Sequence, residues 1–102
     1  MATKLLNAAT ATGAGSAIEA RASNMAFQAI GTTSSGAGTA AVDIEGSLDG
    51  TNFLVLGTIS LTLATTASND GFATDAPWAH IRANVTSISG TDASVTVYMG
   101  AA

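Results

Sequence analysis

The feature that most constrains this chain is a regular alternation of apolar and polar residues in short runs that end at turn-forming residues. In the run AAVDIEGS, the apolar Val42 and Ile44 alternate with the acidic Asp43 and Glu45. A period of two places the apolar side chains on one face of a β-strand. The tetrapeptide DGTN (49–52) follows, and a second apolar run starts directly after it. Two such runs around a short polar break predict a β-hairpin.

The same alternation recurs along the chain. The residues expected to face the core are Met25, Phe27, Ala29, Val42, Ile44, Ile59, Leu61, Leu63, Ile81, Ala83, Val85, Val95, Val97 and Met99. Residues 16–22 and 72–77 predict two weaker, short strands. Together these runs give about seven or eight short strands and no convincing helix, which predicts an all-β fold, a single antiparallel β-sandwich of jelly-roll or immunoglobulin-like type.

Segments rich in Gly, Ser and Thr separate the predicted strands. Residues 31–39, 65–71 and 86–93 have this composition and are expected to be loops. Gly57 interrupts an otherwise apolar run, so it is expected to mark a bulge or a bend.

One domain accounts for the whole chain, because 102 residues are enough for one compact domain and not for two. Residues 1–15 are expected to form a flexible N-terminal arm or an opening strand, and residues 16–102 the sandwich domain. Only 5% of the residues are aromatic. The core is therefore expected to be thin, so burial against a partner would add stability.

Charged residues are sparse, and this restricts the class of partner. They make up 10% of the chain, and the net charge is −4. The basic residues Lys4, Arg21 and Arg82 are scattered, whereas nucleic acids and anionic membranes bind clustered Lys and Arg. We therefore expect no nucleic-acid partner and no membrane partner. A surface of Ala, Ser, Thr and Gly suits close packing between subunits, since small side chains lose little entropy on ordering.

The residues that could carry chemistry do not form a catalytic or metal-binding pattern. His80 is the only histidine, and it alternates with inward-facing residues on a predicted strand. Asp43 and Glu45 share one outward face, which is typical of a solvated strand or of ion pairs. Asp49 and Asp70 each precede a glycine, which indicates turns rather than a calcium site. The sequence therefore predicts no enzyme, no catalytic residue, no cofactor and no metal.

Two stretches resemble small β-sandwich structural proteins in the virions of tailed bacteriophages. The first, GSLDGTNFLVLGTISL (46–61), contains a Gly-Ser-x-Asp-Gly-Thr-x-aromatic turn. The second (70–100) contains an Ala-Pro-aromatic step, then the strand IRANV and a final SVTV strand. The matching residues are Gly46, Ser47, Asp49, Gly50, Thr51, Phe53, Ala76, Pro77, Trp78, Ile81, Arg82, Ala83, Asn84 and Val85. The N-terminal third lies outside this resemblance.

The matched turn is interpreted as scaffolding. Asp49 is expected to accept backbone N–H groups across the turn, and Gly50 to adopt a positive φ. Phe53 is then expected to enter the core beside the strand that carries Ile81.

The second matched stretch receives a similar interpretation. Trp78, which follows Pro77, is expected to close one end of the sandwich. Arg82 is expected to pair with Asp43 or Glu45 across neighbouring strands.

The resemblance implies a virion structural protein, most often a capsid decoration or cement protein, made in the host cytoplasm. The implied partners are the major capsid protein and further copies of the chain, with a homotrimer at local three-fold positions as the expected arrangement. The candidate partner contacts lie in the N-terminal segment and in the loop 31–39. They are Lys4, Leu5, Leu6, Thr32, Thr33, Ser34 and Ser35.

Two alternatives stay open. Within the same class, the chain could be a neck or tail accessory protein. From another class, it could be a carbohydrate-binding β-sandwich for host attachment. Such modules stack sugar rings on exposed aromatic side chains, and here Trp78 or Tyr98 would serve, with His80, Arg82 and Asn84 as hydrogen-bonding groups.

Overall fold

The computed structural model describes residues 2–19, 24–74 and 78–101, which form two antiparallel β-sheets packed together. The strands are β1 (Ala2–Ala9), β2 (Gly13–Ala14), β3 (Ile18–Glu19), β4 (Met25–Thr32), β5 (Ser35–Ser47), β6 (Leu54–Leu63), β7 (Ser68–Thr74), β8 (His80–Thr91) and β9 (Ser94–Ala101). The predicted all-β sandwich is confirmed. The two-residue strand β2 was not predicted, and the two-residue strand β3 lies within the predicted strand 16–22. In the described ranges no helix is long and apolar enough to cross a membrane.

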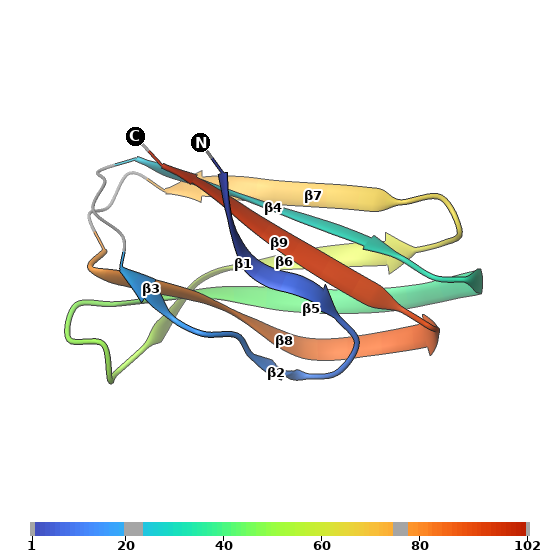
Figure 1. The fold of residues 1–102 in the computed structure, drawn as a ribbon, viewed down its shortest axis with the longest axis horizontal. Coiled ribbons are helices and arrows are strands. Elements are labelled where there is room, and N and C mark those ends of the chain that lie inside the picture. Colours follow the sequence, from blue (N-terminus) through green and yellow to red (C-terminus); the bar gives the residue numbers. More distant parts are fainter. Residues whose placement is uncertain (1, 20–23, 75–77, 102) are drawn as a thin grey trace.

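The two sheets form the two layers of the sandwich. One sheet has the order β1-β9-β4-β7, and the other has the order β2-β8-β5-β6, with β3 also paired to β8. The β4–β5, β6–β7 and β8–β9 connections each pass from one sheet to the other, whereas β5 and β6 form a hairpin within one sheet. Figure 1 shows these three crossings at one end of the elongated molecule, the turn end, and the β5–β6 loop at the opposite end, the hairpin end.

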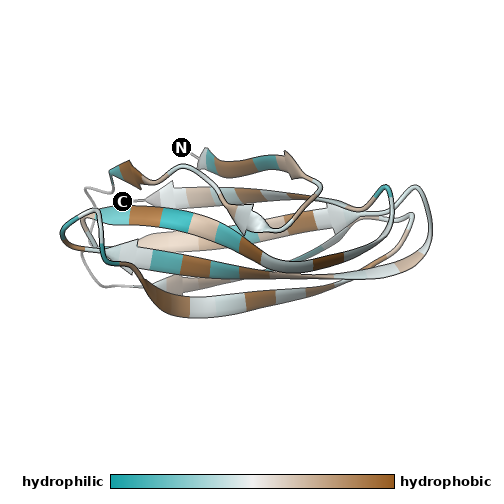
Figure 2. Cartoon of the chain, turned by 90° about the horizontal axis from the view of Figure 1, so that it is seen from below, coloured by the Kyte–Doolittle hydropathy of each residue, from teal (hydrophilic) through white to brown (hydrophobic). Residues whose placement is uncertain are grey.

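The alternating residues build the core between the layers. Every residue predicted to face inward from the alternation of a strand is buried, and Leu5, Ala40 and Ala93 join them. Figure 2 shows the corresponding alternation of hydrophobic and hydrophilic bands along the strands. Because adjacent side chains of a strand point to opposite faces, one polar face of each sheet is left toward solvent.

A bulge interrupts the pairing of β5 and β6. Ile44 pairs with Gly57 and the next residue, Glu45, pairs with Val55, so Leu56 has no partner in the register. The Phe72 ring packs over Gly57, where an added Cβ would lie 2.7 Å from the ring Cζ. The bulge or bend expected at Gly57 is confirmed, and the missing side chain makes room for an aromatic ring.

Three segments predicted as loops are mostly strand. Residues 35–39 belong to β5, residues 68–71 to β7 and residues 86–91 to β8. These predictions were wrong because they rested on Gly, Ser and Thr content, whereas pairing with neighbouring strands overrides such local preferences. At Gly71 the small residue is itself required, because a Cβ there would collide with the carbonyl oxygen of Phe27 on β4.

The N-terminal segment adds edge strands to both layers. β1 pairs with β9, and β2 pairs with β8. Within residues 1–15, Ala2–Ala9 and Gly13–Ala14 are strand, and Leu5 lies in the core. Within residues 16–22, only Ile18–Glu19 is a described strand. Arg21 and Pro77 lie outside the described residues.

Candidate functional site

The β5–β6 loop at the hairpin end is built around one carboxylate. The Asp49 Oδ1 atom accepts hydrogen bonds from the backbone N–H groups of Thr51 and Asn52, each at 2.8 Å, and Oδ2 accepts one from the Asn52 side chain at 2.8 Å. The buried Ser47 hydroxyl donates to Asp49 at 2.8 Å and accepts the Gly50 N–H at 2.9 Å. These bonds hold the pKa of Asp49 well below its usual range, with the backbone bond from Asn52 as the largest cause.

The predicted roles of both turn residues agree with this geometry. Asp49 accepts backbone N–H groups, and Gly50 has a φ of +79°. An added Cβ on Gly50 would lie 3.1 Å from His80 Nε2, so the loop folds back against the outer face of β8. The loop is therefore fixed by its own side chains and by contact with the sheet beneath it.

Phe53 does not enter the core. Its ring is only partly buried, and the guanidinium carbon of Arg82 lies 4.1 Å from the ring centroid. The prediction placed Phe53 beside Ile81, which is fully buried on the opposite, inward face of β8. That prediction was wrong because the loop turns the ring onto the outer face, where it forms a cation–π contact.

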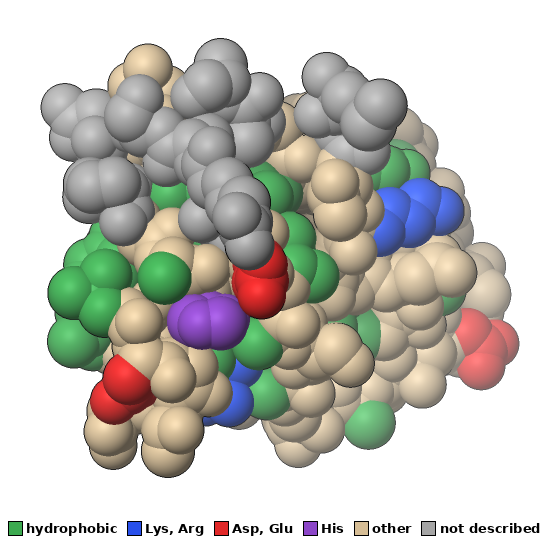
Figure 3. Space-filling model, turned by 60° about the vertical axis from the view of Figure 1, so that its left-hand side comes forward, with side chains coloured by type: hydrophobic (Ala, Val, Ile, Leu, Met, Phe, Trp, Pro, Cys, Tyr) green, Lys and Arg blue, Asp and Glu red, His purple; other side chains and the backbone are tan. Residues whose placement is uncertain are grey.

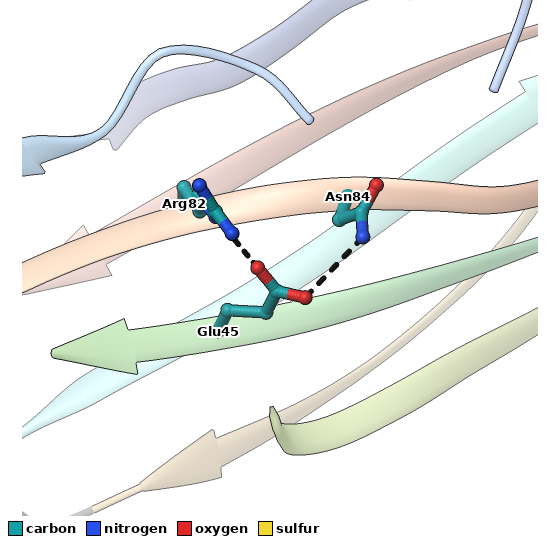
Figure 4. Close-up of polar contacts among 3 residues, drawn as sticks. All are labelled: Glu45, Arg82 and Asn84. Atoms are coloured by element: carbon teal, nitrogen blue, oxygen red, sulfur yellow. Dashed lines mark hydrogen bonds and ion pairs between the residues drawn. The ribbon is translucent and has the colours of Figure 1, made fainter. Parts of the chain in front are cut away.

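A carboxylate, a guanidinium and an amide meet on the same outer face (Figure 4). Arg82 Nε donates to Glu45 Oε1 at 2.6 Å, and Asn84 Nδ2 donates to Glu45 Oε2 at 3.3 Å. The Glu45 side chain is only 10% exposed. Of the two predicted partners of Arg82, the structure selects Glu45, while Asp43 accepts a hydrogen bond from Thr58 at 2.7 Å. Both acidic residues therefore serve strand-to-strand contacts.

Trp78 packs on the inward side of the same end. An added Cβ on the buried Gly46 would lie 2.9 Å from the indole ring and 3.0 Å from Leu56 Cδ1. Trp78 also packs against the core cluster. Gly46 thus leaves the space that the indole fills, in agreement with the predicted closure of one end of the sandwich.

The predicted partner contacts fall into different environments. Lys4 is exposed and lies 5.8 Å from the Tyr98 ring centroid, and Leu6 packs partly against the core. Leu5 is 6% exposed and belongs to the core itself. Its side chain is therefore not part of the surface, because the N-terminal segment is paired as a strand rather than extended as an arm.

The second group of predicted contacts lies at the turn end. Thr32 is partly buried and donates to the Ala64 carbonyl at 3.0 Å. Thr33 is 4% exposed and donates to the Gly36 carbonyl, so it holds the turn instead of facing a partner. Ser34 and Ser35 are exposed. The structure thus leaves only part of this group accessible.

The sequence reasoning did not find two surface features. Leu48, Leu54 and Val55 are exposed at 71%, 55% and 52%. Figure 3 shows hydrophobic side chains gathered beside the histidine at the hairpin end. The second feature is a shallow hollow of about 380 Å³ near the turn end. It is lined by Thr10, Ile88, Ser89, Gly90, Asp92 and Ala93. In the described part of the chain no cluster of metal-ligating residues occurs.

Comparison with known proteins identifies a solved structure of similar fold. No family model and no curated protein matches the sequence. Among solved structures, the PBSX exported protein XepA is similar, with a TM-score of 0.56 and 14% identity. The match covers 100% of this chain and 37% of XepA, so the chain corresponds to little more than a third of that protein's length. At this identity the likeness shows a shared fold.

Proposed function

We propose that the chain is a bacteriophage virion structural protein that decorates the outside of the capsid shell. One observation carries the proposal: the polar side chains that stand out in the sequence are used to hold the fold. Asp49 organises the β5–β6 loop, and Glu45 joins β5 to β8 through Arg82. A site built for catalysis would instead leave such groups directed at a substrate. We therefore propose no catalytic role, no cofactor and no metal.

Two similarities support a phage setting. The resemblance to small virion β-sandwiches rests on the turn at Asp49 and Gly50 and on the strand that carries Arg82. Independently, the whole chain shares its fold with XepA, an exported protein of the phage PBSX. The location proposed is the virion, and the partners proposed are the major capsid protein and other copies of this chain.

The proposed mechanism depends on many weak, identical contacts. The outer face of β6 presents the small side chains of Thr58, Ser60 and Thr62, all of them exposed. Such residues pack closely at little entropic cost, and many symmetry-related copies on one shell add avidity. Of the contacts expected from the sequence, the accessible Ser34 and Ser35 at the turn end are retained for binding the shell.

The carbohydrate-binding alternative has weaker support. Trp78 packs over Gly46 and the core, so its ring is not a flat exposed platform. Tyr98 is partly buried and has Lys4 near its ring. Arg82 and Asn84 are both engaged with Glu45. A neck or tail role differs from decoration in copy number rather than in chemistry, and particle measurements separate the two.

The deciding experiment measures the copy number and position of the chain in purified particles, by quantitative gel electrophoresis and cryo-electron microscopy. Hundreds of copies on the shell would establish decoration. A dozen or fewer at one vertex would move the protein to the neck or tail. Complete absence from particles would overturn the virion role.

The proposed shell contact is tested with variants. Ser35→Arg adds a bulky charge to an exposed position at the turn end, and Gln28→Arg adds the same group to an exposed position on the outer face of β4. Rebinding of each variant to undecorated shells is measured by co-sedimentation. Ser35→Arg is expected to lose binding and Gln28→Arg to retain it. The reverse result would move the contact surface to the outer face of the four-stranded sheet.

A further inference from the structure

The sequence contains two Asp-Gly steps, and the fold places them in different surroundings. Asp49–Gly50, the loop step, lies in the β5–β6 loop, and Asp70–Gly71, the strand step, lies within β7. In an Asp-Gly step the main-chain nitrogen of the glycine can attack the side-chain carboxyl carbon of the aspartate, because glycine has no Cβ to block the approach. The two steps share this chemistry, so the structure around each one decides which of them reacts.

The strand step holds its two reacting groups together. The Gly71 N–H donates to Asp70 Oδ1 at 2.8 Å, so the carboxyl group is folded back toward the nitrogen that would attack it. Asp70 is exposed, and β7 is the last strand in the described order β1-β9-β4-β7 (Figure 1). A strand at the edge of a sheet, with exposed backbone groups, opens locally more easily than a central strand. The strand step therefore has proximity, access to water and local freedom.

The sheet itself requires the glycine of the strand step. A Cβ at Gly71 would collide with the carbonyl oxygen of Phe27 on β4. Any larger residue at this position would slow ring closure, but it would also disturb the pairing of β7 with β4. The close approach of the two strands thus keeps the reactive glycine directly after Asp70.

The loop step is held in an unreactive arrangement. Asp49 accepts hydrogen bonds from the backbone of Thr51 and from both the backbone and the side chain of Asn52, each at 2.8 Å. The Gly50 N–H donates to Ser47 Oγ at 2.9 Å, so the attacking nitrogen is engaged elsewhere. The same network holds the pKa of Asp49 well below its usual range, and a carboxylate is a poorer electrophile than the protonated acid. Reaction at this step first requires breaking that network.

We propose that Asp70 is a site of spontaneous isomerisation to isoaspartate, and that the loop step is protected from the same reaction. The Gly71 nitrogen bonds to the Asp70 carboxyl carbon, the nitrogen loses its proton and the carboxyl group loses a hydroxyl, so that one water leaves and a five-membered cyclic imide remains. Water then opens the imide at either carbonyl. One opening restores aspartate, and the other leaves the main chain running through the side chain of residue 70. One water is lost and one is gained, with no oxidation or reduction.

Isomerisation would lengthen the backbone of β7 by one carbon. Phe72 lies opposite Phe27 in the β4–β7 register, and their ring centroids are 5.2 Å apart. The Phe72 ring also packs over Gly57. An extra main-chain carbon just before these contacts shifts the register and displaces the ring, so the modified chain is expected to be less stable. This inference does not rest on the virion role, because the reaction takes place in the isolated chain.

The test follows both steps in one sample. The folded full chain is incubated in buffer made with water enriched in a heavy oxygen isotope, and is then digested in ordinary water with chymotrypsin. Cleavage after Phe53 and Leu63 separates the two steps. Mass spectrometry measures the heavy oxygen taken up at each step, and chromatography resolves isoaspartyl from aspartyl peptides. The strand step is expected to react about tenfold faster than the loop step or more, because the loop step must first lose hydrogen bonds to a charged group.

Two controls separate the effect of structure from that of sequence. In denaturing urea the two rates should converge, since the unfolded chain presents both steps alike. Asp70→Glu keeps the charge but needs a larger ring, so uptake at position 70 should fall to background while the loop step is unchanged. Equal rates in the folded chain, or a faster loop step, would overturn the proposal. A difference of the same size in urea would overturn it too, because flanking residues would then be the cause.

Stability gives a second readout. Wild type and Asp70→Glu are aged side by side, and their thermal unfolding is followed by circular dichroism. The freshly prepared samples verify that the variant folds. The unfolding midpoint of the wild type is expected to fall with time, whereas that of Asp70→Glu stays constant. An equal decline in both chains would contradict a role for the strand step.

Discussion

The two ends of the sandwich are held together in different ways. At the turn end, backbone groups hydrogen-bond across the turns, from Thr33 N–H to the Ala64 carbonyl and from Ser34 N–H to the Thr91 carbonyl, each at 3.0 Å. At the hairpin end, side chains fix the loop, chiefly through Asp49. Side chains also contribute at the turn end, where Thr32 donates to the Ala64 carbonyl and Thr33 to the Gly36 carbonyl. The turn end therefore combines backbone and side-chain hydrogen bonds, whereas the hairpin end depends chiefly on the side chain of Asp49.

The difference extends to the surfaces of the two ends. The three large hydrophobic residues most exposed in the described chain, Leu48, Leu54 and Val55, all lie in or next to the β5–β6 loop. At the turn end, by contrast, Leu63 is fully buried beside Gly31. A single strand, β6, thus runs from an exposed apolar beginning to a buried apolar end. Substitutions along it measure the contrast directly.

The largest expected effect comes from the pair Leu63→Ala and Leu54→Ala. Leu63→Ala removes buried methyl groups and is expected to lower the free energy of unfolding by about 3 kcal/mol. Leu54→Ala removes the same groups from an exposed position, so the change should stay within about 0.5 kcal/mol. Urea unfolding of both variants gives the comparison. Equal losses would show that Leu54 is buried in solution.

A smaller effect is expected from Arg82→Met, which keeps an apolar stem near Phe53 and removes the charge. The carboxylate of Glu45, 10% exposed, would keep only Asn84 as a partner. Because a buried unpaired charge is unfavourable and Arg82 is itself partly exposed, the expected loss is about 1–2 kcal/mol. Adding Glu45→Gln to this variant should recover part of it. No recovery in that double variant would mean that Arg82 acts through packing alone.

The smallest expected effect concerns pH. The pKa of Asp49 is lower in the folded chain than its ordinary value of 3.8, so folding favours the carboxylate. This contribution is fully present above the ordinary value and is lost as the pH falls from there toward the lowered pKa. Acid unfolding of Asp49→Asn should lack this part of the pH dependence. In an NMR titration, the amide signals of Thr51 and Asn52 should move at lower pH than a free aspartate titrates, while that of Thr33 stays constant.

The sequence predicts the core well because period-two alternation reports burial directly. Val42 and Ile44 face inward, as the pattern requires of a sheet with one solvated face. The turn at Asp49 and Gly50 is predictable for a similar reason, since its hydrogen bonds are local. Features that depend only on residues close together in the chain can therefore be predicted from local sequence patterns.

The features that depend on distant neighbours were not predictable. The segment 35–39 is strand because β8 and β6 lie beside it, although its composition favours a loop. Phe53 lies on the outer face because the loop folds back onto Arg82. The exposure of Leu54 and Val55 follows from the bulge at Leu56, which shifts the register of an uninterrupted apolar run. The alternation of residues within one strand does not reveal a shift in its pairing register.

The pairing of the first strand with the last has a consequence for engineering. Ala2 lies opposite Gly100 in the β1–β9 register, so the start of β1 and the end of β9 lie close together, as Figure 1 shows. A cargo fused ahead of Ala2 and another fused behind Gly100 would therefore leave the sandwich as neighbours. A short linker between these points would also allow the chain to be reopened elsewhere, for instance within residues 64–67, as a circular permutant.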